Sequence, residues 1–538
     1  MPESKRGNGF RFDPEECRVD AASLSAGRGK GAVAAGHPLT ATAAAEVLTA
    51  GGNAFDAALA AMCTATVAEP VLASFGGGGF LLARPADGPA RLFDFFAQTP
   101  KRGPDPGGRD FYPVVADFGA AQQEFHIGLG SMAVPGAVSG LFEAHRALGR
   151  MPLARIVEPA LAVARDGYDL TPFQGYLFSV VGPIYMASAG ARRIFARPDD
   201  DDHLIGTGDH FRNPDAADFL EALVRDGPDL FYRGDIARRI VEDCRTGGGT
   251  LSADDLDAYR TEQRSPLAVD FAGARILTNP PPSSGGLLIV FALKLMERTG
   301  ALAGDWGTPE HLSLLARVFD VTDGARRTTP AEDLTSLLEP EAVVAYQRAV
   351  AAHPQARRGT THVSVIDGAG NACALTLSNG EGAGYVVPGT GVMMNNMLGE
   401  EDINPGGFES WPLDRRMGSM MAPTAVLGDG RIWVLGSGGS NRIRTAVAQV
   451  IANLVAFGMP SARAVDCPRI HVEHGRLDIE PGWSDAAVAA LAEGFPDARI
   501  WPDRNLFFGG VHVAAAGAEG FEAAGDPRRC GAALVPGA

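Results

Sequence analysis

The sequence predicts a large protein of the α/β class, built from both helices and strands. Its 538 residues are 46% hydrophobic and 21% charged, a composition that is typical of soluble globular proteins and excludes intrinsic disorder. Helical patterns broken by Gly and Pro fill residues 135–300, whereas β-branched residues in rough alternation begin at residue 360. The length fits three or four domains of roughly 150 residues, or one large α/β unit.

The N-terminal part is expected to begin with a loose polar arm over residues 1–30, followed by two helices and a hairpin. Gly51-Gly52-Asn53 ends the first helix in the manner of a glycine C-cap, and the second helix is nearly all apolar and therefore buried. Asp87-Gly88 is typical of a hairpin turn. The expected elements are helices over residues 40–50 and 54–67 and strands over residues 80–84 and 91–96.

Further helices are expected through the middle of the chain, and strands after it. Ser252 and Asp255 form a capping box at one helix start. A hairpin begins at Thr360, and Asp429-Gly430 joins two later strands. The expected helices cover residues 141–148, 153–166, 216–225, 236–246, 286–293, 341–352 and 442–457, the expected strands cover residues 360–367, 372–378, 421–426 and 432–435, and residues 353–359 are expected to form an exposed loop.

The charge balance and the lack of targeting patterns exclude several classes of partner. The net charge of −17 opposes binding to nucleic acid or to anionic membranes, so we expect neither as a partner. The acidic run Asp199-Asp200-Asp201-Asp202 is expected to be a solvated loop. Neither a signal-peptide core nor an 18-residue apolar run occurs, which predicts a cytoplasmic protein without a transmembrane helix.

Neither the cysteines nor the histidines form a known metal or redox motif. The six cysteines lack CxxC spacing, which indicates no zinc site or disulfide framework and fits a reducing compartment. The sequence around His471 and His474 predicts a strand that runs into a turn, which points their side chains to opposite faces. We therefore expect them to be exposed to solvent rather than to bind a metal, and we expect no metal or cofactor in this protein.

Two features have the residue types that amide chemistry needs. Thr360 begins a strand directly after the loop-like residue Gly359, and residues 435–442 form a glycine-rich turn between a strand and a helix. Such a turn presents successive backbone N–H groups, as an oxyanion hole does. Each feature also fits a purely structural role: Thr360 is typical of the start of a strand with high β propensity, and residues 435–442 are typical of a tight connection between a strand and a helix. The run Gly76-Gly77-Gly78-Gly79 is not a Walker loop, because no Lys-Ser or Lys-Thr follows it.

A series of stretches, in order along the chain, resembles the γ-glutamyltranspeptidases, a family of N-terminal-nucleophile hydrolases. The resemblance runs from about residue 30 to residue 535. A single matching stretch would be weak, but all of them in this order are a strong indication. The matching stretches are residues 51–58, 69–70, 76–80, 134–136, 280–286, 360–365, 391–396, 421–424, 436–443 and 526–528.

The resemblance implies a proenzyme that cuts itself between Gly359 and Thr360. The large chain would be residues 1–359 and the small chain residues 360–538. The two chains would stay associated in one four-layer αββα sandwich, with both contributing to the two central sheets. A strand that begins at Thr360 after an exposed loop fits such a cut.

The resemblance also implies the catalytic residues. Thr360 would be the nucleophile, and its α-amine would be the general base, because an α-amine titrates near pH 7.7–8.0. The backbone N–H groups of Gly439 and Ser440 would hold the oxyanion, where the family usually has two glycines. Ser378, 18 residues after Thr360, would replace a second Thr that orients the nucleophile.

The residues expected to bind the substrate depart from the family pattern. Phe96 stands where the family has an Arg that binds the α-carboxylate of the γ-glutamyl group. Asn379 matches a pocket Asn if one residue is deleted. Glu400 is placed to bind the α-amine, and Ser419 keeps one hydroxyl of a serine pair that clamps the carboxylate.

Two further differences concern polarity and charge. Met397 replaces a polar ligand of the family pocket. A substitute for the missing cation would have to come from another arginine. The candidates are Arg102, Arg415 and Arg416.

The first interpretation is a γ-glutamyltranspeptidase-like enzyme that transfers the acyl group of γ-glutamyl amides such as glutathione to water or an amine. The first alternative keeps the nucleophile but acts on a different small acyl amide, because the carboxylate clamp is hard to replace once Phe96 takes the place of Arg. The second alternative is an inactive binding homologue on the same scaffold. The intact Thr360, Ser378 and glycine-rich turn argue against that last alternative.

Overall fold

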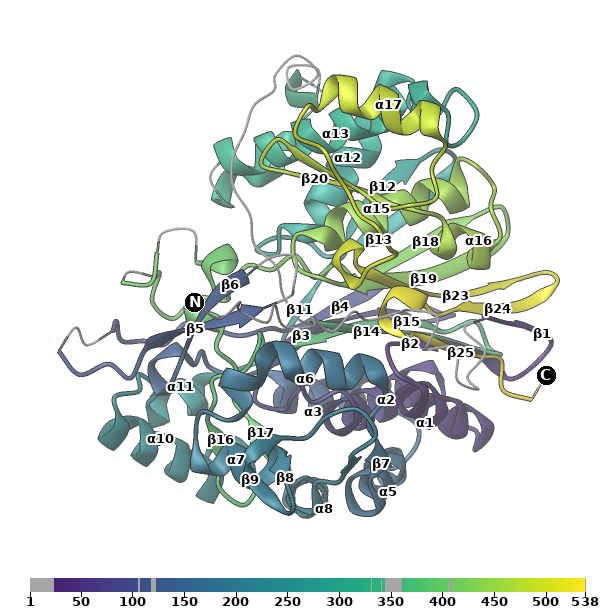
Figure 1. The fold of residues 1–538 in the computed structure, drawn as a ribbon. Coiled ribbons are helices and arrows are strands. Elements are labelled where there is room, and N and C mark those ends of the chain that lie inside the picture. Colours follow the sequence, from purple (N-terminus) through teal and green to yellow (C-terminus); the bar gives the residue numbers. More distant parts are fainter. Residues whose placement is uncertain are drawn as a thin grey trace.

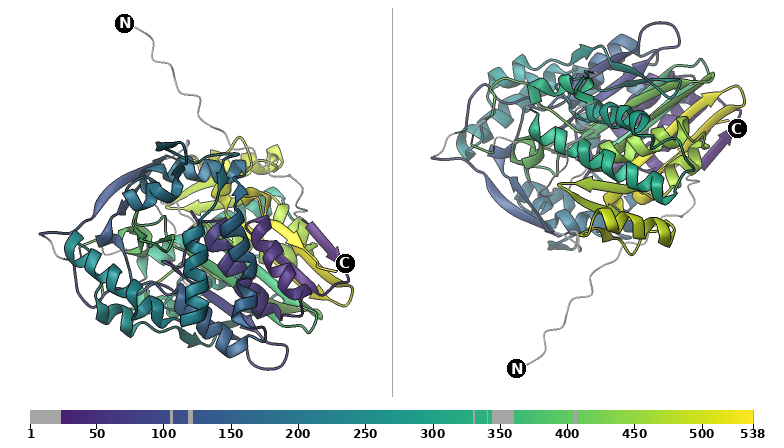
Figure 2. Two further views of the ribbon diagram at one scale, coloured as in Figure 1. Left: turned by 90° about the horizontal axis from the view of Figure 1, so that it is seen from below. Right: turned by 90° about the horizontal axis from the view of Figure 1, so that it is seen from above.

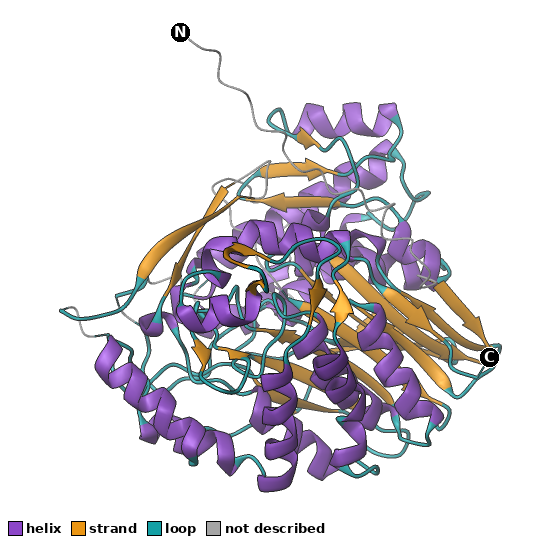
Figure 3. Cartoon of the chain, turned by 60° about the horizontal axis from the view of Figure 1, so that its bottom comes forward, coloured by secondary structure: helices purple, strands orange, loops and turns teal. Residues whose placement is uncertain are grey.

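Two antiparallel sheets lie face to face at the centre of the computed structural model, and helices cover the outer face of each (Figure 1; Figure 2). This is the four-layer αββα sandwich that was predicted, and Figure 3 shows the strands enclosed between helices. The structure describes residues 24–104, 107–117, 122–329, 331–339, 341–343, 360–404, 407–409 and 411–537.

Each central sheet has seven strands in the described part of the chain. The first has, in spatial order, β1 (Leu24–Gly27), β24 (Gly520–Ala524), β23 (Gly510–Gly517), β19 (Arg431–Gly438), β18 (Thr424–Gly428), β13 (Ala274–Thr278) and β12 (Leu267–Phe271). The second has β11 (Glu262–Arg264), β4 (Arg91–Phe95), β3 (Gly78–Arg84), β15 (Ala372–Ser378), β14 (Thr361–Asp367), β2 (Gly31–Ala35) and β25 (Ala532–Leu534).

Both sheets interleave strands from the two sides of residue 360. In the second sheet β14 and β15, which follow residue 360, lie between β3 and β2, which precede it. In the first sheet β18 pairs with β13 in the same way. Residues 24–343 and residues 360–537 therefore share their cores and cannot fold apart as separate domains, wherever the chain is cut.

One helical layer covers the second sheet, and its innermost member is α2. Asn53 caps this helix and forms a capping box with Asp56, a signal that the sequence analysis did not use. Gly51 has φ +93° after α1, as the expected glycine stop requires. This part of the chain contains α1 (Pro38–Thr49), α2 (Ala54–Ala68), α3 (Ala137–Leu148), α4 (Leu153–Ile156), α5 (Glu158–Asp166), α6 (Pro172–Tyr185), α7 (Ala189–Phe195), α8 (Pro214–Asp226), α9 (Asp229–Tyr232), α10 (Asp235–Gly247) and α11 (Ala253–Ala258).

The opposite helical layer covers the first sheet, at the top of Figure 1. Its apolar faces pack on β19 and β23 and join the largest hydrophobic cluster. The helices on this side are α12 (Gly285–Thr299), α13 (Pro309–Thr328), α15 (Arg442–Val455), α16 (Ser461–Asp466) and α17 (Asp485–Gly494). None of the described helices is both long enough and apolar enough to cross a bilayer.

Short strands and 3₁₀ turns complete the fold. The long hairpin β5–β6 projects from the body at the left of Figure 1. The small sheets are β5 (Tyr112–Asp117) with β6 (Gln122–Ile127), β7 (Tyr168–Asp169) with β10 (His210–Phe211), β8 (Ala196–Arg197) with β9 (Asp200–Leu204), β16 (Val386–Val387) with β17 (Val392–Met393), and β20 (Ile470–Glu473) with β21 (Arg476–Ile479) and β22 (Arg499–Ile500). The 3₁₀ turns are η2 (Leu129–Ser131), η3 (Ala331–Leu338), η4 (Met397–Gly399), η5 (Glu401–Ile403), η6 (Leu506–Phe508) and η7 (Pro527–Arg529).

Most expected elements occur, and the exceptions have local causes. The helix expected over residues 153–166 is divided at Val157, because α5 restarts with Pro159 in its first turn. The strand expected at residue 421 begins only at Thr424, after Pro423, which has no N–H to donate. The acidic run at residues 199–202 is exposed as expected, but it enters strand β9 instead of a loop. The expected arm at residues 1–30 lies outside the described residues as far as residue 23, as do most of the helix expected at residues 341–352 and the loop expected at residues 353–359.

Two expectations about histidine and cysteine are wrong. His471 is buried, because β20 lies against α15, and its ring hydrogen-bonds Thr445 at 2.8 Å. His474 is half-buried in the turn after that strand, with φ +56°. Cys530 is disulfide-bonded, although the cysteine spacing indicated no disulfide framework.

One group of residues among those described has the ligand types of a metal site, but arginines already neutralise it. Asp323, Glu473 and His474 bring their ligand atoms together between α13 and β20. Arg444, however, pairs with Asp323 at 2.8 Å, and Arg327 pairs with it at 3.2 Å. The group is therefore a buried ion-pair network that ties the helices to β20.

The interface between the two central sheets contains polar side chains. His362 of β14 contacts Thr376 of β15 at 2.8 Å and Ser364 at 3.0 Å. His512 of β23 accepts a hydrogen bond from the backbone N–H of Asp526 at 3.2 Å. Burial lowers the pKa of His512 to about 4 and holds the pKa of His362 well below its ordinary value. Both rings are therefore neutral at physiological pH.

The neutral state of His512 makes the stability of the fold depend on pH. Between pH 6.5 and 4 the unfolded chain binds a proton at this residue and the folded chain does not, so the free energy of unfolding falls as the pH is lowered through this range. The full contribution is about 3 kcal/mol. His512→Asn should therefore show a shallower loss of stability between pH 7 and 4.5, measured by urea unfolding at each pH.

The matched control for this prediction is His203→Asn. The side chain of His203 is 69% exposed, so this variant should keep the wild-type pH slope. A His512→Asn protein whose slope equals that of the wild type would contradict the lowered pKa.

Candidate active site

Thr360 and Ser378 lie side by side because of the hairpin register. Thr361 is opposite Leu377 in the β14–β15 pair, and one further step in this antiparallel register places Thr360 opposite Ser378. The spacing of 18 residues noted in the sequence is thus the geometry of one tight hairpin. The hydroxyl side chains of both residues lie at the end of the second sheet where the strand pair begins.

A cavity opens at this end of the sheet and brings together six of the predicted site residues. Each comes from a different segment of the chain, so the fold and not local sequence assembles them. The six are Phe96, Thr360, Ser378, Glu400, Ser419 and Ser440.

The glycine-rich turn between β19 and α15 lies against the backbone of Thr360. An ideal Cβ atom placed on Gly438 would be 2.0 Å from the Thr360 carbonyl oxygen, so only glycine fits there. Gly439 has φ +118°, and Ser440 has φ +51°. A side-chain-bearing residue in that left-handed region costs roughly 1–2 kcal/mol, which the family's glycine would avoid.

Hydrogen bonds on both sides fix this turn. Ser437 donates through its hydroxyl to the Gly438 carbonyl at 2.7 Å and accepts from the N–H of Gly510 at 3.0 Å. Asn441 donates to Glu473 at 2.5 Å. The turn is therefore held by neighbouring strands before α15 begins, which is the rigid backbone that an oxyanion hole needs.

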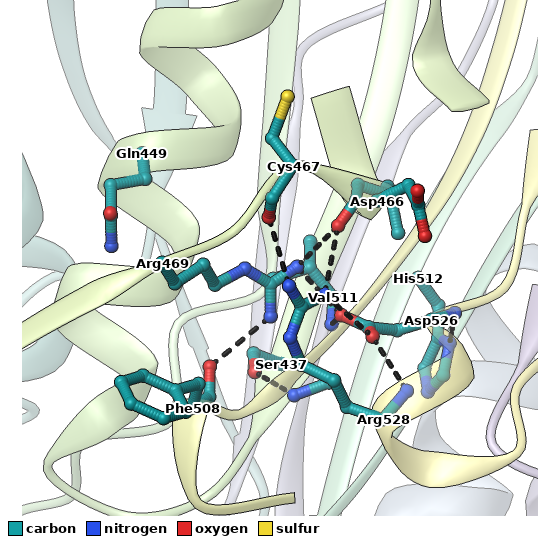
Figure 4. A network of polar contacts seen from close by, with 12 residues as sticks. Ser437, Gln449, Asp466, Cys467, Arg469, Phe508, Val511, His512, Asp526 and Arg528 are labelled. Atoms are coloured by element: carbon teal, nitrogen blue, oxygen red, sulfur yellow. Dashed lines mark hydrogen bonds and ion pairs between the residues drawn. The ribbon is translucent and has the colours of Figure 1, made fainter. Parts of the chain in front are cut away.

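A buried ion network lies behind the turn and holds η7 in place (Figure 4). Arg469 pairs with Asp526 at 2.6 Å, and Arg528 pairs with Asp526 at 3.2 Å and with Glu480 at 2.5 Å. Burial alone would raise the pKa of Asp526, but the two guanidinium groups hold it well below its ordinary value. Removing one member of such a network leaves an uncompensated buried charge, which is strongly destabilising.

Among the predicted substrate-binding residues, Phe96 and Glu400 line the cavity and Asn379 does not. Phe96 stacks on Phe80 with ring centroids 5.4 Å apart and presents an apolar edge to the cavity. Glu400 packs against Gly380, where an ideal Cβ would lie only 2.1 Å from a carboxylate oxygen, so the lack of a side chain leaves room for the carboxylate. Asn379 is fully buried and is not among the residues that line the cavity.

None of the three arginines considered as a substitute cation lines the cavity. Arg416 is engaged elsewhere, because it donates to the Phe96 carbonyl and to the Tyr259 hydroxyl and lies 3.6 Å from a carboxylate oxygen of Asp94. Arg102 and Arg415 are exposed. Among the described residues that line the cavity, Glu400 is the one with an ionisable acid or base, and no lysine or arginine joins it.

The remaining lining residues were missed by the sequence analysis, apart from Met397, which it noted as a departure. They are apolar and come from segments distant in the chain; Met421 and Ile443 lie within stretches that match the family, but no sequence signal placed any of these residues at the site. They make the cavity wall largely hydrophobic. They are Ile403, Met420, Met421 and Ile443.

Comparisons with known proteins agree on a family. A sequence model described as Gamma-glutamyltranspeptidase matches residues 40–535. The chain is 31% identical over 494 residues to the Acylase ACY 1 proenzyme of Pseudomonas sp. (strain SE83), covering 86% of each chain. It is 30% identical over 493 residues to the Glutathione hydrolase proenzyme of Escherichia coli (strain K12), covering 83% of this chain and 82% of the relative.

Solved structures support the same fold. The cephalosporin acylase from Bacillus halodurans superposes with a TM-score of 0.79 and 22% sequence identity, covering 99% of both chains. At this identity the likeness shows the fold alone.

The contact between Gly438 and Thr360 predicts the effect of adding one methyl group. Gly438→Ala should lower the free energy of unfolding by about 1–3 kcal/mol or more, because the new Cβ meets backbone atoms that cannot move aside. Gly324→Ala in α13 is the control. An ideal Cβ there meets nothing within 4 Å, and alanine favours helix. Urea unfolding measures both variants, and a Gly438→Ala protein as stable as the wild type would contradict the prediction.

Proposed function

The chain belongs to the γ-glutamyltranspeptidase family, and from that premise we propose that it cuts itself before Thr360 and then hydrolyses or transfers the acyl group of a small amide. The observation that carries this proposal is the cavity in which Thr360, Ser378 and Ser440 meet. Self-cleavage would make Thr360 the first residue of the small chain, so that its hydroxyl and its α-amine belong to the same residue.

The proposed reaction needs no cofactor. The α-amine of Thr360 accepts the proton of the Oγ hydroxyl as Oγ forms a bond to the acyl carbon. The amine then gives that proton to the leaving nitrogen as the carbon–nitrogen bond breaks, and an acyl-enzyme remains. Water or an amine attacks this ester in the second half of the reaction. The N–H groups of Gly439 and Ser440 are proposed to hold the oxyanion in both halves, and loss of one such donor typically costs about 2.7–4 kcal/mol.

For the acyl group, the cavity favours an apolar chain without an α-carboxylate. The apolar part of its lining consists of Phe, Met and Ile side chains, and no lysine or arginine lines the cavity among the described residues. A carboxylate placed there would lose its solvation without gaining a cationic partner. Glu400 would accept a hydrogen bond from an amine or hydroxyl on the acyl chain. The similarity to an acylase proenzyme supports an acylase activity.

The second candidate substrate is a γ-glutamyl amide such as glutathione. Glu400 and Ser419 remain at positions where the family binds the amine and the carboxylate, and both line the cavity. The similarity to a glutathione hydrolase proenzyme supports this candidate. In either case the large and small chains are proposed to stay associated, because both supply strands to each central sheet.

Self-cleavage should be visible on a denaturing gel. The 56.1 kDa chain should give pieces of about 37 and 19 kDa, in proportion to lengths of 359 and 179 residues. Thr360→Ala should remain a single band because it lacks the attacking oxygen. Thr361→Ala serves as the control, since Thr361 bonds Glu69 at 2.6 Å and supplies no nucleophile. An active wild-type protein that stays in one piece would rule out the mechanism.

The substrate class can be decided by a panel of amides and one substitution. We expect γ-glutamyl and glutaryl anilides, whose acyl chains both end in a carboxylate, to have a high KM, and butyryl anilide, which has no carboxylate, to compete well. Phe96→Arg should lower the KM for the γ-glutamyl substrate by roughly 10- to 100-fold, because hydrogen bonds to charged groups contribute about 1.5–3 kcal/mol. Self-cleavage should be unchanged, since it involves Thr360 and not the pocket.

Phe96→Met is the control for this substitution, because it keeps an apolar side chain beside Phe80 without adding a charge. It should leave the order of substrate preference as in the wild type. A wild-type KM for glutathione in the low micromolar range would refute the first candidate. So would a Phe96→Arg enzyme whose preference does not change.

A further inference from the structure

Arg529 is a buried arginine in contact with Thr360, and it has no part in the reaction proposed for that residue. It ends η7, directly after the ion network of Asp526 and Arg528. Its side chain is almost fully buried, and one terminal nitrogen donates to the Thr360 carbonyl oxygen at 3.3 Å.

Glycines on two strands make room for this side chain. An ideal Cβ on Gly510 would lie 2.4 Å from Arg529 Cδ, and one on Gly438 would lie 3.0 Å from a terminal guanidinium nitrogen. An ideal Cβ on Gly439, in the proposed oxyanion turn, would lie 3.2 Å from the other terminal nitrogen. The guanidinium is therefore held between the turn and the start of β14, with little freedom to move.

No ion pair of Arg529 occurs among the described residues, although Asp526, Glu381 and Glu69 act on its charge at longer range. Its Nε and its second terminal nitrogen have no hydrogen-bond partner among the described residues. Of the acids near it, Asp526 is already paired with Arg469 and Arg528. Burial raises the pKa of Glu69, which also accepts hydrogen bonds from two threonines.

The other charged or titratable groups around Arg529 and Thr360 leave Arg529 positively charged at neutral pH. Arg442 adds a second buried cation near Arg529, and the His512 ring is neutral. Glu381 and, on the cavity side, Glu400 are the remaining acids. Burial together with Arg442 lowers the pKa of Arg529 to about 10, which still leaves it charged at neutral pH.

We infer that Arg529 is a positioning residue that holds the Thr360 carbonyl and keeps the neighbouring α-amine in its neutral, proton-accepting form. The amine and the carbonyl oxygen belong to one residue and are separated by three bonds, so a cation on the oxygen is also close to the nitrogen. A nearby like charge disfavours the protonated form of an amine. This inference rests on the proposed function, because the α-amine is a base only after self-cleavage.

As a consequence, the enzyme should become active at a lower pH than an ordinary α-amine would allow. An ordinary α-amine is half protonated near pH 7.7–8.0 and is then unable to accept the Oγ proton. With Arg529 in place, the neutral fraction at pH 7 rises. The acid limb of kcat/KM, which reports groups of the free enzyme, should therefore lie below that range in the wild type.

The test compares Arg529→Gln, which removes the charge, with Arg529→Lys, which keeps it. Acyl transfer from p-nitrophenyl acetate to the enzyme is followed from pH 5.5 to 9.5, and mass spectrometry confirms the acetyl group on the small chain. Arg529→Gln should move the acid limb upward by about one pH unit. Its rate should be about tenfold lower at pH 6 and close to wild type above pH 9. Arg529→Lys should keep most of the wild-type profile.

Arg298→Gln, at an exposed position of α12, is the control and should leave the profile unchanged. An Arg529→Gln enzyme that is slower by the same factor at every pH would reduce Arg529 to a structural role and overturn the inference. If Arg529→Gln remained uncut while Arg529→Lys was cut, Arg529 would act in processing instead, which also overturns it. A wild-type protein that is neither cut nor acetylated would refute the proposed function itself, so the two failures are distinguishable.

Discussion

The site depends on one close contact between the two central sheets. The end of β19 in the first sheet lies so near the start of β14 in the second that Gly438 has no room for a side chain beside the Thr360 carbonyl. Gly436 faces the His362 ring in the same way, with an ideal Cβ only 2.3 Å from it. This spacing fixes how far the glycine-rich turn is from Thr360, and therefore where backbone N–H groups can meet an oxyanion.

The same contact explains why a strongly acidic protein carries buried arginines at its centre. Turns and strand ends that approach this closely cannot be separated by water, so their carbonyl groups need buried donors. Arg469 and Arg528 each donate to backbone carbonyls as well as to Asp526 or Glu480. Arg529 extends this arrangement to the Thr360 carbonyl. The net charge of −17 therefore describes the surface of the molecule and not the surroundings of Thr360.

The parts of the site that were predictable from sequence are those fixed by local geometry. Thr360 and Ser378 are joined by one hairpin whose turn and strand lengths can be read from the residues, and the glycine-rich turn is continuous in sequence. The apolar wall could not be predicted, because Met420 and Ile443 have ordinary spacing and meet the cavity only through tertiary packing. His471 was misjudged for the same reason: strand alternation says which residues share a face, but not that both α13 and α15 pack against β20.

The two sides of the cavity are held in place by different kinds of contact. The residues proposed to carry out the reaction lie on one side, and those proposed to select the acyl group lie on the other. The residues beside Thr360 are constrained by backbone contacts and ion pairs, so that most substitutions there would disturb the fold as well as the reaction. The opposite wall, with Phe96 and Met397, is held by side-chain packing, which tolerates apolar substitutions of similar volume. A change of acyl group can thus arise on that wall at little cost to stability. The proposed replacement of the family's arginine by Phe96 would be such a change, because it would remove a positive charge from an apolar wall without disturbing the packing of that wall.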